Sequence, residues 1–471
     1  MRFVSRVCFN QIEPGQIQSF VAAITLLLIG LVTITLGNAA QTAVEKGASE
    51  DSWPQWRGPQ GQGHAPTAVN VPRLWSENQN ICWKTPVPGR GWSSPVIAGD
   101  QIWLTTAIES VLSEDLKKKR LEGNTNSQTL TVSGPISLRA ICIDRASGKI
   151  VKEIECLHVD EPDPIHTLNS FASPTPILDA DRGRLYCHFG TNGTACIDTT
   201  TETGHVVWRN QDQRIAHENG PGSTPVLFED FLIFDCDGSD RQYVVALDTK
   251  TGTVAWKTDR SGTLNENPQL KKAYGTPLLL QIEGKQVLLS TGADWLYGYD
   301  PQTGRELWKM SYGVLGFSIV PRPVAAHGML YVSTSFIQPE LLGVRLGDGV
   351  AVPEIMWRVK KGAPTMPSPL VIGDELYMVS DKGVATCVDA RSGEVRWSER
   401  LGGNFCSSPM FADGRIYVGN REGQVFVIEP GKTFVLEATN SLEGEVMATP
   451  AALDHSIYLR TDKAMYRIEK K

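Results

Sequence analysis

A nine-residue phrase recurs in the second half of this chain and constrains its fold more than any other feature. It reads DTKTGTVAW from Asp248 to Trp256, DPQTGRELW from Asp300 to Trp308 and DARSGEVRW from Asp389 to Trp397. An Asp whose side chain bonds the amides that follow it, a Ser or Thr, and a Gly with positive φ together favour a tight turn. Each phrase therefore predicts a β-hairpin with its tryptophan on the second strand.

The phrase belongs to a longer repeated unit, of which residues 368–397 are the cleanest copy. Each unit holds four short segments that alternate apolar and polar residues, are rich in Val, Ile, Tyr and Trp, and are separated by turn residues, as in β-strands. Units recur about every 40 to 50 residues, an interval typical of β-propellers, in which each sheet is one blade. The chain is therefore predicted to be all-β. The recurring tryptophans, which we expect to fill the space between blades, are Trp208, Trp256, Trp308, Trp357 and Trp397.

The number of units predicts the number of blades. Eight units begin at Ser94, Ser173, Ser223, Gly275, Pro321, Ser368, Ser408 and Thr449. The last unit has room for three strands, whereas residues 80–88 resemble a fourth strand with no strands before it. We therefore predict an eight-bladed β-propeller of four-stranded antiparallel blades over residues 80–471, with the ring closed by pairing of this N-terminal strand with the C-terminal strands. Residues 41–79 are expected to form a strap outside the ring.

The N-terminus predicts export. Arg2 and Arg6 precede an uncharged run from Phe20 to Leu36, and small residues follow it. This pattern is intermediate between a secretory signal and a membrane span, so residues 1–40 are either a cleaved signal peptide or an N-terminal membrane anchor. Both alternatives place the rest of the chain in the periplasm or another extracytoplasmic space. In the second alternative, residues 20–36 anchor it in the inner membrane.

Nine cysteines are present, and one of them, Cys8, lies in the leader. None of the others forms a C-x-x-C pair, so neither a zinc site nor a redox dithiol is indicated. Export permits disulfides, and Cys187 and Cys196 flank a predicted turn, but a shift of one residue in register would separate them. Buried free thiols are the alternative interpretation.

The charge of the chain argues against nucleic-acid binding. The formal net charge is -7 and the pI is about 5.7, whereas neutralising phosphates needs clustered Lys and Arg. One dense basic run, residues 117–120, has acidic neighbours and is interpreted as a solvated loop. We expect no nucleic-acid partner, and membrane contact only through the N-terminal anchor.

Unusual polar residues gather in two classes of loop that a propeller brings to one face. These are the loops between second and third strands and the loops between blades, and a long insertion, about residues 108–136, falls in the first class. The candidate ligand-binding residues of the resulting funnel are His217, Glu218, Asp237, Asp240, Arg241, Asp294, Trp295 and Arg322. Such residues suit a hard cation or sugar hydroxyls beside an aromatic ring. Ordinary turn residues and surface charges are the alternative.

No catalytic residue and no resident metal is predicted, because no nucleophile stands beside a recognisable base.

The repeated D-x-x-[ST]-G-x-x-x-W phrase resembles that of the pyrroloquinoline-quinone-repeat, or tryptophan-docking, β-propeller superfamily, and the resemblance covers residues 80–471. One branch comprises quinoprotein dehydrogenases, which bind pyrroloquinoline quinone (PQQ) and calcium. Another comprises non-catalytic, BamB-like propellers of the outer-membrane β-barrel assembly machinery. The stretch from Trp53 to Gly63 is also similar to exported propellers of planctomycete-type bacteria.

The resemblance implies a function that this sequence fits only in part. Quinoprotein dehydrogenases have adjacent cysteines beside the quinone, and this chain has none; the lipid-attachment cysteine of BamB is also missing. We expect an exported, non-catalytic binding or scaffold protein of the cell envelope, with envelope proteins or polymers as partners and no cofactor. The alternatives are a PQQ-dependent quinoprotein oxidoreductase with calcium, and a polysaccharide-active hydrolase or lyase that uses Glu218 and Asp240.

Overall fold

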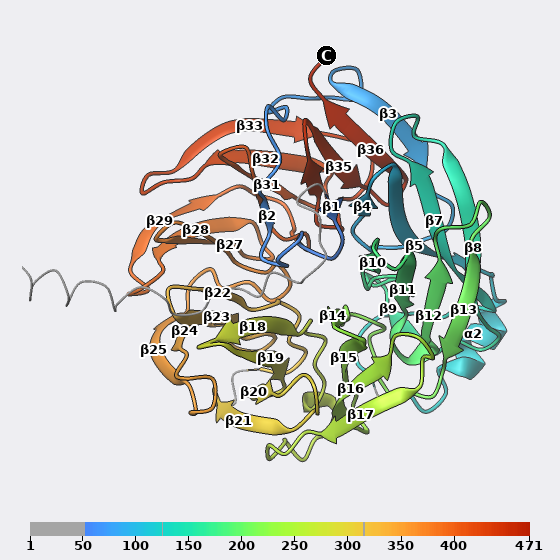
Figure 1. The fold of residues 1–471 in the computed structure, drawn as a ribbon, viewed down its shortest axis with the longest axis horizontal. Coiled ribbons are helices and arrows are strands. Elements are labelled where there is room, and N and C mark those ends of the chain that lie inside the picture. Colours follow the sequence, from blue (N-terminus) through green and yellow to red (C-terminus); the bar gives the residue numbers. More distant parts are fainter. Residues whose placement is uncertain (1–51, 125, 314–315) are drawn as a thin grey trace, which may run out of the picture. The chain divides into compact units, whose positions relative to one another are not determined.

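The structure, a computed structural model, describes residues 52–124, 126–313 and 316–471, and eight four-stranded antiparallel sheets make up most of them. The sheets stand around a central channel as the blades of a propeller (Figure 1). This confirms the predicted all-β, eight-bladed fold. Blade 1 consists of β4 (Val96–Ala98), β5 (Gln101–Glu109), β7 (Ile136–Asp144) and β8 (Ile150–Val159), and blade 2 of β10 (Ile177–Asp179), β11 (Arg184–His188), β12 (Thr194–Asp198) and β13 (His205–Asn210). Blade 3 consists of β14 (Val226–Phe228), β15 (Phe231–Asp237), β16 (Gln242–Asp248) and β17 (Val254–Asp259), and blade 4 of β18 (Leu278–Ile282), β19 (Lys285–Gly292), β20 (Trp295–Tyr299) and β21 (Glu306–Ser311).

The remaining blades repeat the same order, with the first strand innermost. Blade 5 consists of β22 (Val324–Ala326), β23 (Met329–Ser333), β24 (Leu341–Arg345) and β25 (Glu354–Val359), and blade 6 of β26 (Leu370–Ile372), β27 (Glu375–Val379), β28 (Val384–Asp389) and β29 (Val395–Arg400). Blade 7 consists of β30 (Met410–Ala412), β31 (Arg415–Gly419), β32 (Gln424–Glu429) and β33 (Val435–Ser441), and blade 8 of β34 (Ala451–Leu453), β35 (Ser456–Arg460), β36 (Ala464–Glu469) and β3 (Ile81–Pro86).

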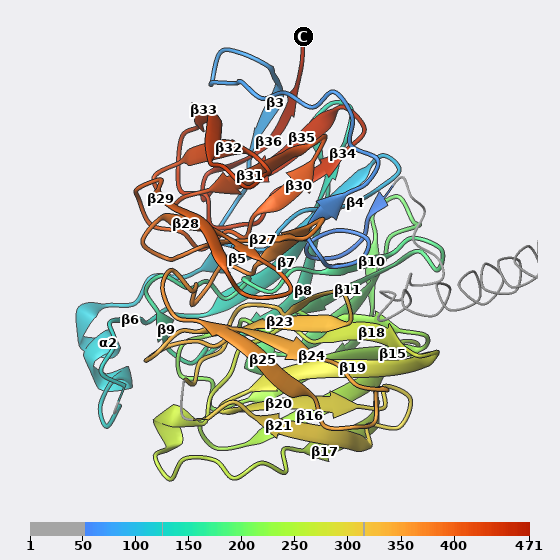
Figure 2. The same ribbon diagram turned by 90° about the vertical axis from the view of Figure 1, so that its left-hand side faces the viewer.

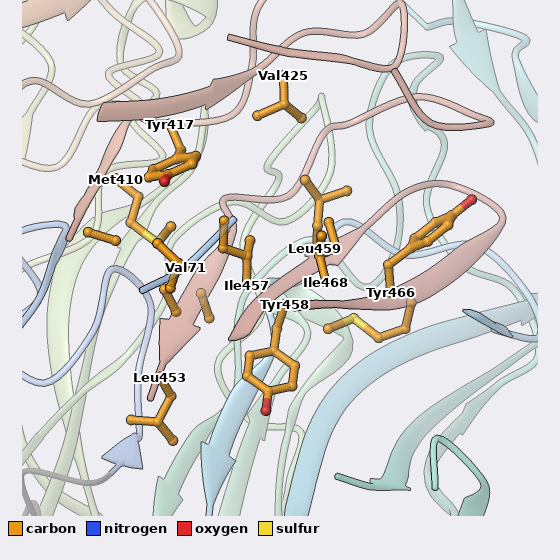
Figure 3. Close-up of a cluster of buried hydrophobic side chains, with 14 of the residues drawn as sticks. Val71, Met410, Tyr417, Val425, Leu453, Ile457, Tyr458, Leu459, Tyr466 and Ile468 are labelled. Atoms are coloured by element: carbon orange, nitrogen blue, oxygen red, sulfur yellow. The ribbon is translucent and has the colours of Figure 1, made fainter. Parts of the chain in front are cut away.

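Blade 8 joins the two ends of the propeller. Its outer strand β3 pairs antiparallel with β36, the last strand of the chain, and Thr85 lies opposite Met465. The buried faces of β34, β35 and β36 continue into blade 7 as one apolar cluster, which includes Tyr417 and Tyr458 (Figure 3). The ring is therefore closed by the strand pairing that the sequence predicted.

The turn of the repeated phrase has the predicted geometry. In blade 3, Asp248 Oδ1 accepts hydrogen bonds from the backbone N–H groups of Lys250 (2.9 Å) and Thr251 (2.8 Å). Gly252 closes the turn at a φ of +72°, in the left-handed region that favours glycine. The aspartate and the glycine of the phrase thus fix the register of the hairpin that follows.

Residues 52–65, the first part of the predicted strap, lie inside the ring rather than outside it. Strand β1 (Ser52–Trp53) pairs antiparallel with β4, and β2 (His64–Ala65) pairs in parallel with β30, so each adds a strand to the inner edge of a blade (Figure 1). The Trp53 side chain is buried, as are Val71 and Trp75 further along. The physical reason is that innermost strands leave backbone donors and acceptors unpaired along the channel, and a short extended segment satisfies them.

The predicted insertion follows the second strand of blade 1. It contains a short helix, α2 (Glu114–Arg120), and a strand, β6 (Leu130–Thr131), which pairs with β9 (Ile165–His166) of the next inter-blade connection. The helix projects from the ring (Figure 2). The sequence predicted a loop here and not this helix, because seven helical residues after the serine cap at Ser113 make only about two turns, too few for a visible period.

The predicted leader, residues 1–40, lies outside the described residues. In the described part of the chain, no helix combines the length and apolar character needed to span a membrane. All eight cysteines of this part are free thiols. Cys187 lies opposite Ala195, and Cys196 lies opposite Tyr186, so the one-residue shift separates the pair that flanks the turn.

Candidate functional site

A cavity of about 400 Å³ lies where the inter-blade connections meet around the channel. Residues from all eight connections contribute to its lining, together with the β23–β24 loop and residue 56 of the strap. The apolar lining includes Trp56, Trp92, Tyr274, Phe336, Met366 and Met447. A volume of this size falls within the range of small-molecule pockets, about 300 to 1,000 Å³.

The polar ends of three of these aromatic side chains are bonded within the protein. Trp92 Nε1 donates to the carbonyl oxygen of Leu168 (3.0 Å), and Trp56 Nε1 donates to Thr449 Oγ1 (3.3 Å). Tyr274 Oη donates to the carbonyl oxygen of His217 (2.5 Å). The aromatic carbons of these rings therefore remain available for contact in the cavity.

The Ser-Pro and Thr-Pro starts of the repeated units form a chain of hydrogen bonds around the cavity. At six junctions the backbone N–H of one start donates to the hydroxyl of the start in the next blade, at 2.9 to 3.1 Å: Ser94 to Thr175, Thr175 to Thr224, Thr224 to Thr276, Arg322 to Ser368, Ser368 to Ser408, and Ser408 to Thr449. These hydroxyls hold neighbouring blades together at the axis, which explains why the unit starts with Ser or Thr.

Arg322 occupies the start position of blade 5, where most other units have a hydroxyl. Its side chain is buried and donates from Nε to the carbonyl oxygen of Pro277 (3.0 Å) in the preceding unit. It also donates from Nη1 to the carbonyl oxygens of Trp56 and Gly61, both at 3.4 Å. Arg322, one of the predicted funnel residues, therefore fastens the strap to the ring beside the cavity.

The side chains that line the cavity carry no formal charge at neutral pH. Among the described residues that line it there is no Asp, Glu, Lys or Arg. His166 lines it, and burial holds the pKa of its imidazole below the usual value. Cys406 also lines it, and burial raises the pKa of its thiol to about 12. Both side chains are therefore uncharged.

Four of the predicted funnel residues lie together above blade 3, in the loops that carry residues 216–218 and 239–241. His217 is buried; burial lowers the pKa of its imidazole to about 4, although nearby carboxylates oppose the shift. Glu218 Oε1 accepts a hydrogen bond from Ser239 Oγ (2.8 Å), and Asp240 Oδ1 accepts one from the backbone N–H of residue 216 (2.8 Å). Arg241 Nε lies 3.7 Å from Asp240 Oδ2. These contacts tie the two loops to each other.

Asp237 belongs to a buried ion cluster between blades 3 and 4. Arg260 Nη2 lies 2.7 Å from Asp237 Oδ2 and 3.2 Å from Asp235 Oδ1, and all three side chains are about 1% exposed. Ser290 Oγ lies 2.8 Å from both carboxylate oxygens of Asp235. Burial raises the pKa of both carboxyls, that of Asp235 to about 7, while Arg260 opposes the shift. A substrate cannot reach these groups unless the two blades separate.

The other two predicted residues are Asp294, in the β19–β20 turn of blade 4, and Trp295, the first residue of β20. Asp294 has a φ of +63°, and burial raises the pKa of its carboxyl. Trp295 Nε1 donates to the carbonyl oxygen of Thr263 (3.0 Å). None of the eight predicted residues lines the central cavity, and no group of three or more His, Cys, Asp or Glu in the described residues is placed to hold a metal ion.

The aromatic residues and methionines of the cavity were missed by sequence reasoning. A signal was present, because the residue before the repeated proline in five of the units, namely Ser94, Thr175, Thr224, Thr276 and Thr449, lines the cavity. Lining residues such as Trp92 and Met447 stand a few positions before those starts. The prediction selected loops by their polar residues. The lining residues could instead have been identified by their position next to the repeated Ser-Pro or Thr-Pro.

Eight sheets in a closed ring, joined blade to blade by tryptophans, define a tryptophan-docking β-propeller. The family model described as "Outer membrane protein assembly factor BamB" matches residues 191–355 and 353–436, just over half of the chain. The chain belongs to this family of PQQ-like-repeat propellers.

Curated relatives come from both branches of the superfamily. The chain is 30% identical over 104 residues to the outer membrane protein assembly factor BamB of Burkholderia pseudomallei (strain K96243), covering 22% of this chain and 26% of the relative. It is 26% identical over 152 residues to subunit 1 of the methanol dehydrogenase [cytochrome c] of Methylobacterium organophilum, covering 27% of this chain and 22% of the relative. These matches span about a quarter of each relative's length.

Solved structures show the same fold. BamB from Moraxella catarrhalis superposes with a TM-score of 0.51 at 17% identity, over 78% of this chain and 98% of that protein. The quinohemoprotein alcohol dehydrogenase from Comamonas testosteroni superposes with a TM-score of 0.57 at 10% identity, over 91% of this chain and 82% of that protein. At these identities the likeness concerns the fold alone, so function has to be argued from the site.

The residues of the central cavity do not fit PQQ with calcium. The quinone carries several carboxylates, and calcium prefers a shell of oxygen ligands in which carboxylates are prominent. The described lining offers neither a cationic side chain for the quinone nor a carboxylate for the metal. Burying such charges without partners is costly.

Proposed function

We propose that this protein is an exported, non-catalytic β-propeller that binds other proteins of the cell envelope, as a scaffold of the BamB-like kind. Membership of the BamB family supports this role. The observation that carries the proposal is the uncharged lining of the central cavity, which has no Asp, Glu, Lys or Arg among the described residues. General acid–base and metal-ion catalysis use charged or titratable side chains placed at the reacting atoms.

The titratable groups near the axis also argue for a binding role. His166 belongs to the connection before blade 2 and Cys406 to the connection before blade 7, so they stand in different parts of the ring. His166 Nδ1 accepts a hydrogen bond from the backbone N–H of Leu168 (3.1 Å), and the raised pKa of Cys406 keeps its thiol protonated. A nucleophile activated by an adjacent base needs the two within hydrogen-bond reach.

The proposed function lies outside the cytoplasm. The charged N-terminus and the apolar run of residues 20–36 support a periplasmic or other extracytoplasmic location, either free after cleavage or held by an N-terminal anchor. The partners we propose are therefore envelope proteins rather than cytoplasmic ones.

A PQQ-dependent oxidoreductase is the second candidate, favoured by the local similarity to a methanol dehydrogenase subunit. Its test is reconstitution of the purified protein with PQQ and calcium. We expect no stoichiometric uptake of the quinone and no dye reduction with alcohols or sugars, because the cavity lacks the required charges. Stoichiometric uptake with substrate-dependent dye reduction would establish this candidate instead.

Affinity capture tests the proposal directly. The tagged full-length protein, expressed in its native host, is purified from envelope extract, and complexes are separated by gel filtration. We expect an envelope protein to co-elute in stoichiometric amount and to be identified by mass spectrometry. Absence of a stoichiometric envelope partner across mild extraction conditions would contradict the proposal.

A further inference from the structure

We propose that the central cavity binds an uncharged, largely apolar small molecule that contains an aromatic ring system, and that Phe336 closes over it. This inference goes beyond the scaffold role, because it assigns a ligand to a cavity that partner binding does not need. It rests on the composition of the lining, on the fixed position of Trp56 in it, and on the exposed apolar residues at the cavity edge.

The lining favours apolar contact over hydrogen bonding. Trp56, Trp92 and Tyr274 have their indole N–H and phenol O–H groups bonded within the protein, so their carbon faces are what a ligand would meet. Stacking on such faces contributes affinity beyond simple area burial. Met366 and Met447 add flexible, polarisable side chains that adapt to irregular apolar shapes.

The polar groups of the lining are largely committed to the ring itself. Thr175, Thr224 and Thr449 each accept a backbone hydrogen bond from a neighbouring blade. Asn169 donates from Nδ2 to the carbonyl oxygens of Asn219 (2.8 Å) and Pro221 (3.1 Å). An apolar ligand leaves these bonds in place, whereas a ligand that needs the same hydroxyl oxygens as acceptors, or the Asn169 amide as a donor, would compete with them.

The absence of charge selects against ionised ligands. With no Asp, Glu, Lys or Arg in the described lining, an anionic or cationic group would lose its hydration without direct contact with a counter-ion. A neutral ring system avoids this cost and gains from the removal of apolar surface from water.

The strap contributes one residue to the wall of the cavity. Trp56 contributes to the lining, and its backbone oxygen is held by Arg322. Strands β1 and β2 fix the strap on either side, against blade 1 and blade 7. A ligand therefore meets an indole that is held in a fixed position.

The β23–β24 loop places exposed apolar residues at the edge of the cavity. Phe336 lines the cavity yet is 53% exposed, and the neighbouring Ile337 is 57% exposed. Phe336 packs edge to face against Phe317, with ring centroids 5.8 Å apart. Ile337 has a φ of +119°, which is unfavourable for a β-branched residue, and such strain gathers where loops bind or move. A bound ring would bury the exposed face of Phe336.

Two matched probes test the inference on the full-length protein in detergent-free buffer. N-phenyl-1-naphthylamine is neutral, and 8-anilinonaphthalene-1-sulfonate has the same ring system with an added anionic group. Fluorescence titration should give saturable binding of the neutral probe at one site per chain. The sulfonate should bind about tenfold more weakly or worse, since its charge has no partner in the cavity.

Two variants locate the site. Phe336→Ala should weaken binding of the neutral probe by about fivefold or more, because it removes the aromatic edge. Met356→Ala is the matched control, since Met356 is a similarly exposed apolar residue (45%) on the outer strand of the same blade. Met447→Glu should abolish binding by placing a charge in the cavity; a circular dichroism spectrum and melting curve like those of the parent protein show that the variant is folded.

Several results would overturn the inference. These are a lack of saturable binding by the neutral probe, equal affinity for the sulfonate, or equal effects of Phe336→Ala and Met356→Ala. None of them bears on the scaffold role, which is tested by stoichiometric capture of an envelope protein. Failure of the capture experiment would likewise leave the probe titration as an independent result.

Discussion

Trp208 in blade 2 lies against Gly252 in the β16–β17 turn of blade 3, so closely that a β-carbon on Gly252 would come within 2.5 Å of the indole ring. The indole Nε1 also donates to the carbonyl oxygen of Thr249 in the same turn (2.9 Å). Trp256 and Gly304 repeat this relationship one blade further on. The repeated phrase therefore joins blades, because its turn receives the tryptophan of the preceding blade.

Trp208→Ala should destabilise the fold strongly. The substitution removes a buried indole and its hydrogen bond to Thr249, and we expect the free energy of unfolding to fall by about 3–5 kcal/mol. Urea unfolding followed by circular dichroism measures this change. The control is Val207→Ala on the same strand, at a side chain that is 40% exposed, with an expected change within about 0.5 kcal/mol. Similar losses in the two variants would contradict the docking role.

Gly252→Ala separates steric contact from backbone strain when it is compared with Gly284→Ala. Both glycines have positive φ, +72° and +81°, but no atom lies within 4 Å of a β-carbon built on Gly284. Gly284→Ala should cost about 1–2 kcal/mol through strain alone. Gly252→Ala should cost a further ~1–3 kcal/mol because the methyl group meets Trp208. Equal melting temperatures for the two variants would rule out this close contact.

The fold was predictable from the sequence because the same turn residues and the same tryptophan recur in many of its repeats. Asp248, Gly252 and Trp208 each have one role, and copies of each recur about every 40 to 50 residues, so the blades could be counted and the closing strand recognised. The strap could not be placed in the same way. Its strands β1 and β2 have two residues each, and their partners β4 and β30 lie far away in sequence, so no local pattern encodes the pairing.

The candidate site was harder to predict because polar residues in loops find partners in more than one place. Asp237 appeared as a funnel carboxylate, yet it pairs with Arg260 inside the protein. Arg322 sits near the axis but is used to hold the strap. The cavity is instead lined by apolar residues such as Trp92 and Met447, which in a sequence cannot be told apart from ordinary core residues.

Thr224→Val tests the hydrogen bonds around the cavity. Valine has nearly the shape of threonine but cannot accept the bond from the backbone N–H of Thr175, which would be left buried without a partner. We expect a loss of about 1–3 kcal/mol in the free energy of unfolding. Thr201→Val, at an exposed turn, is the control and should be close to neutral. If both variants melt at the temperature of the parent protein, these bonds do not stabilise the ring.

Asp235 should make stability depend on pH. Burial raises the pKa of its carboxyl to about 7 from an ordinary value of 3.8, so the folded protein retains a proton that the unfolded chain releases between these values. The protonated carboxyl therefore contributes its full stabilisation of the fold below the pKa that it has in the unfolded chain. This stabilisation is lost as the pH rises through the pKa that it has in the folded protein.

Asp235→Asn keeps a neutral side chain and removes this dependence. The stability of the variant relative to the parent protein should therefore increase between about pH 5 and about pH 8. Denaturant titrations at several pH values provide the measurement, with Asp181→Asn at an exposed turn as the control. A difference between variant and parent that stays constant with pH would show that Asp235 is not held protonated.

Closure of the ring by its two ends is the claim on which the cavity and the arrangement of its lining depend. Hydrogen–deuterium exchange of the full-length protein, read by mass spectrometry on peptides that cover β3 and β36, tests it most directly. Because β3 pairs with β36 along residues 81–86, we predict that its amides are protected to a similar degree as those of outer strands such as β13. Rapid exchange throughout residues 81–86, at the rate of an unpaired segment, would contradict the closed ring.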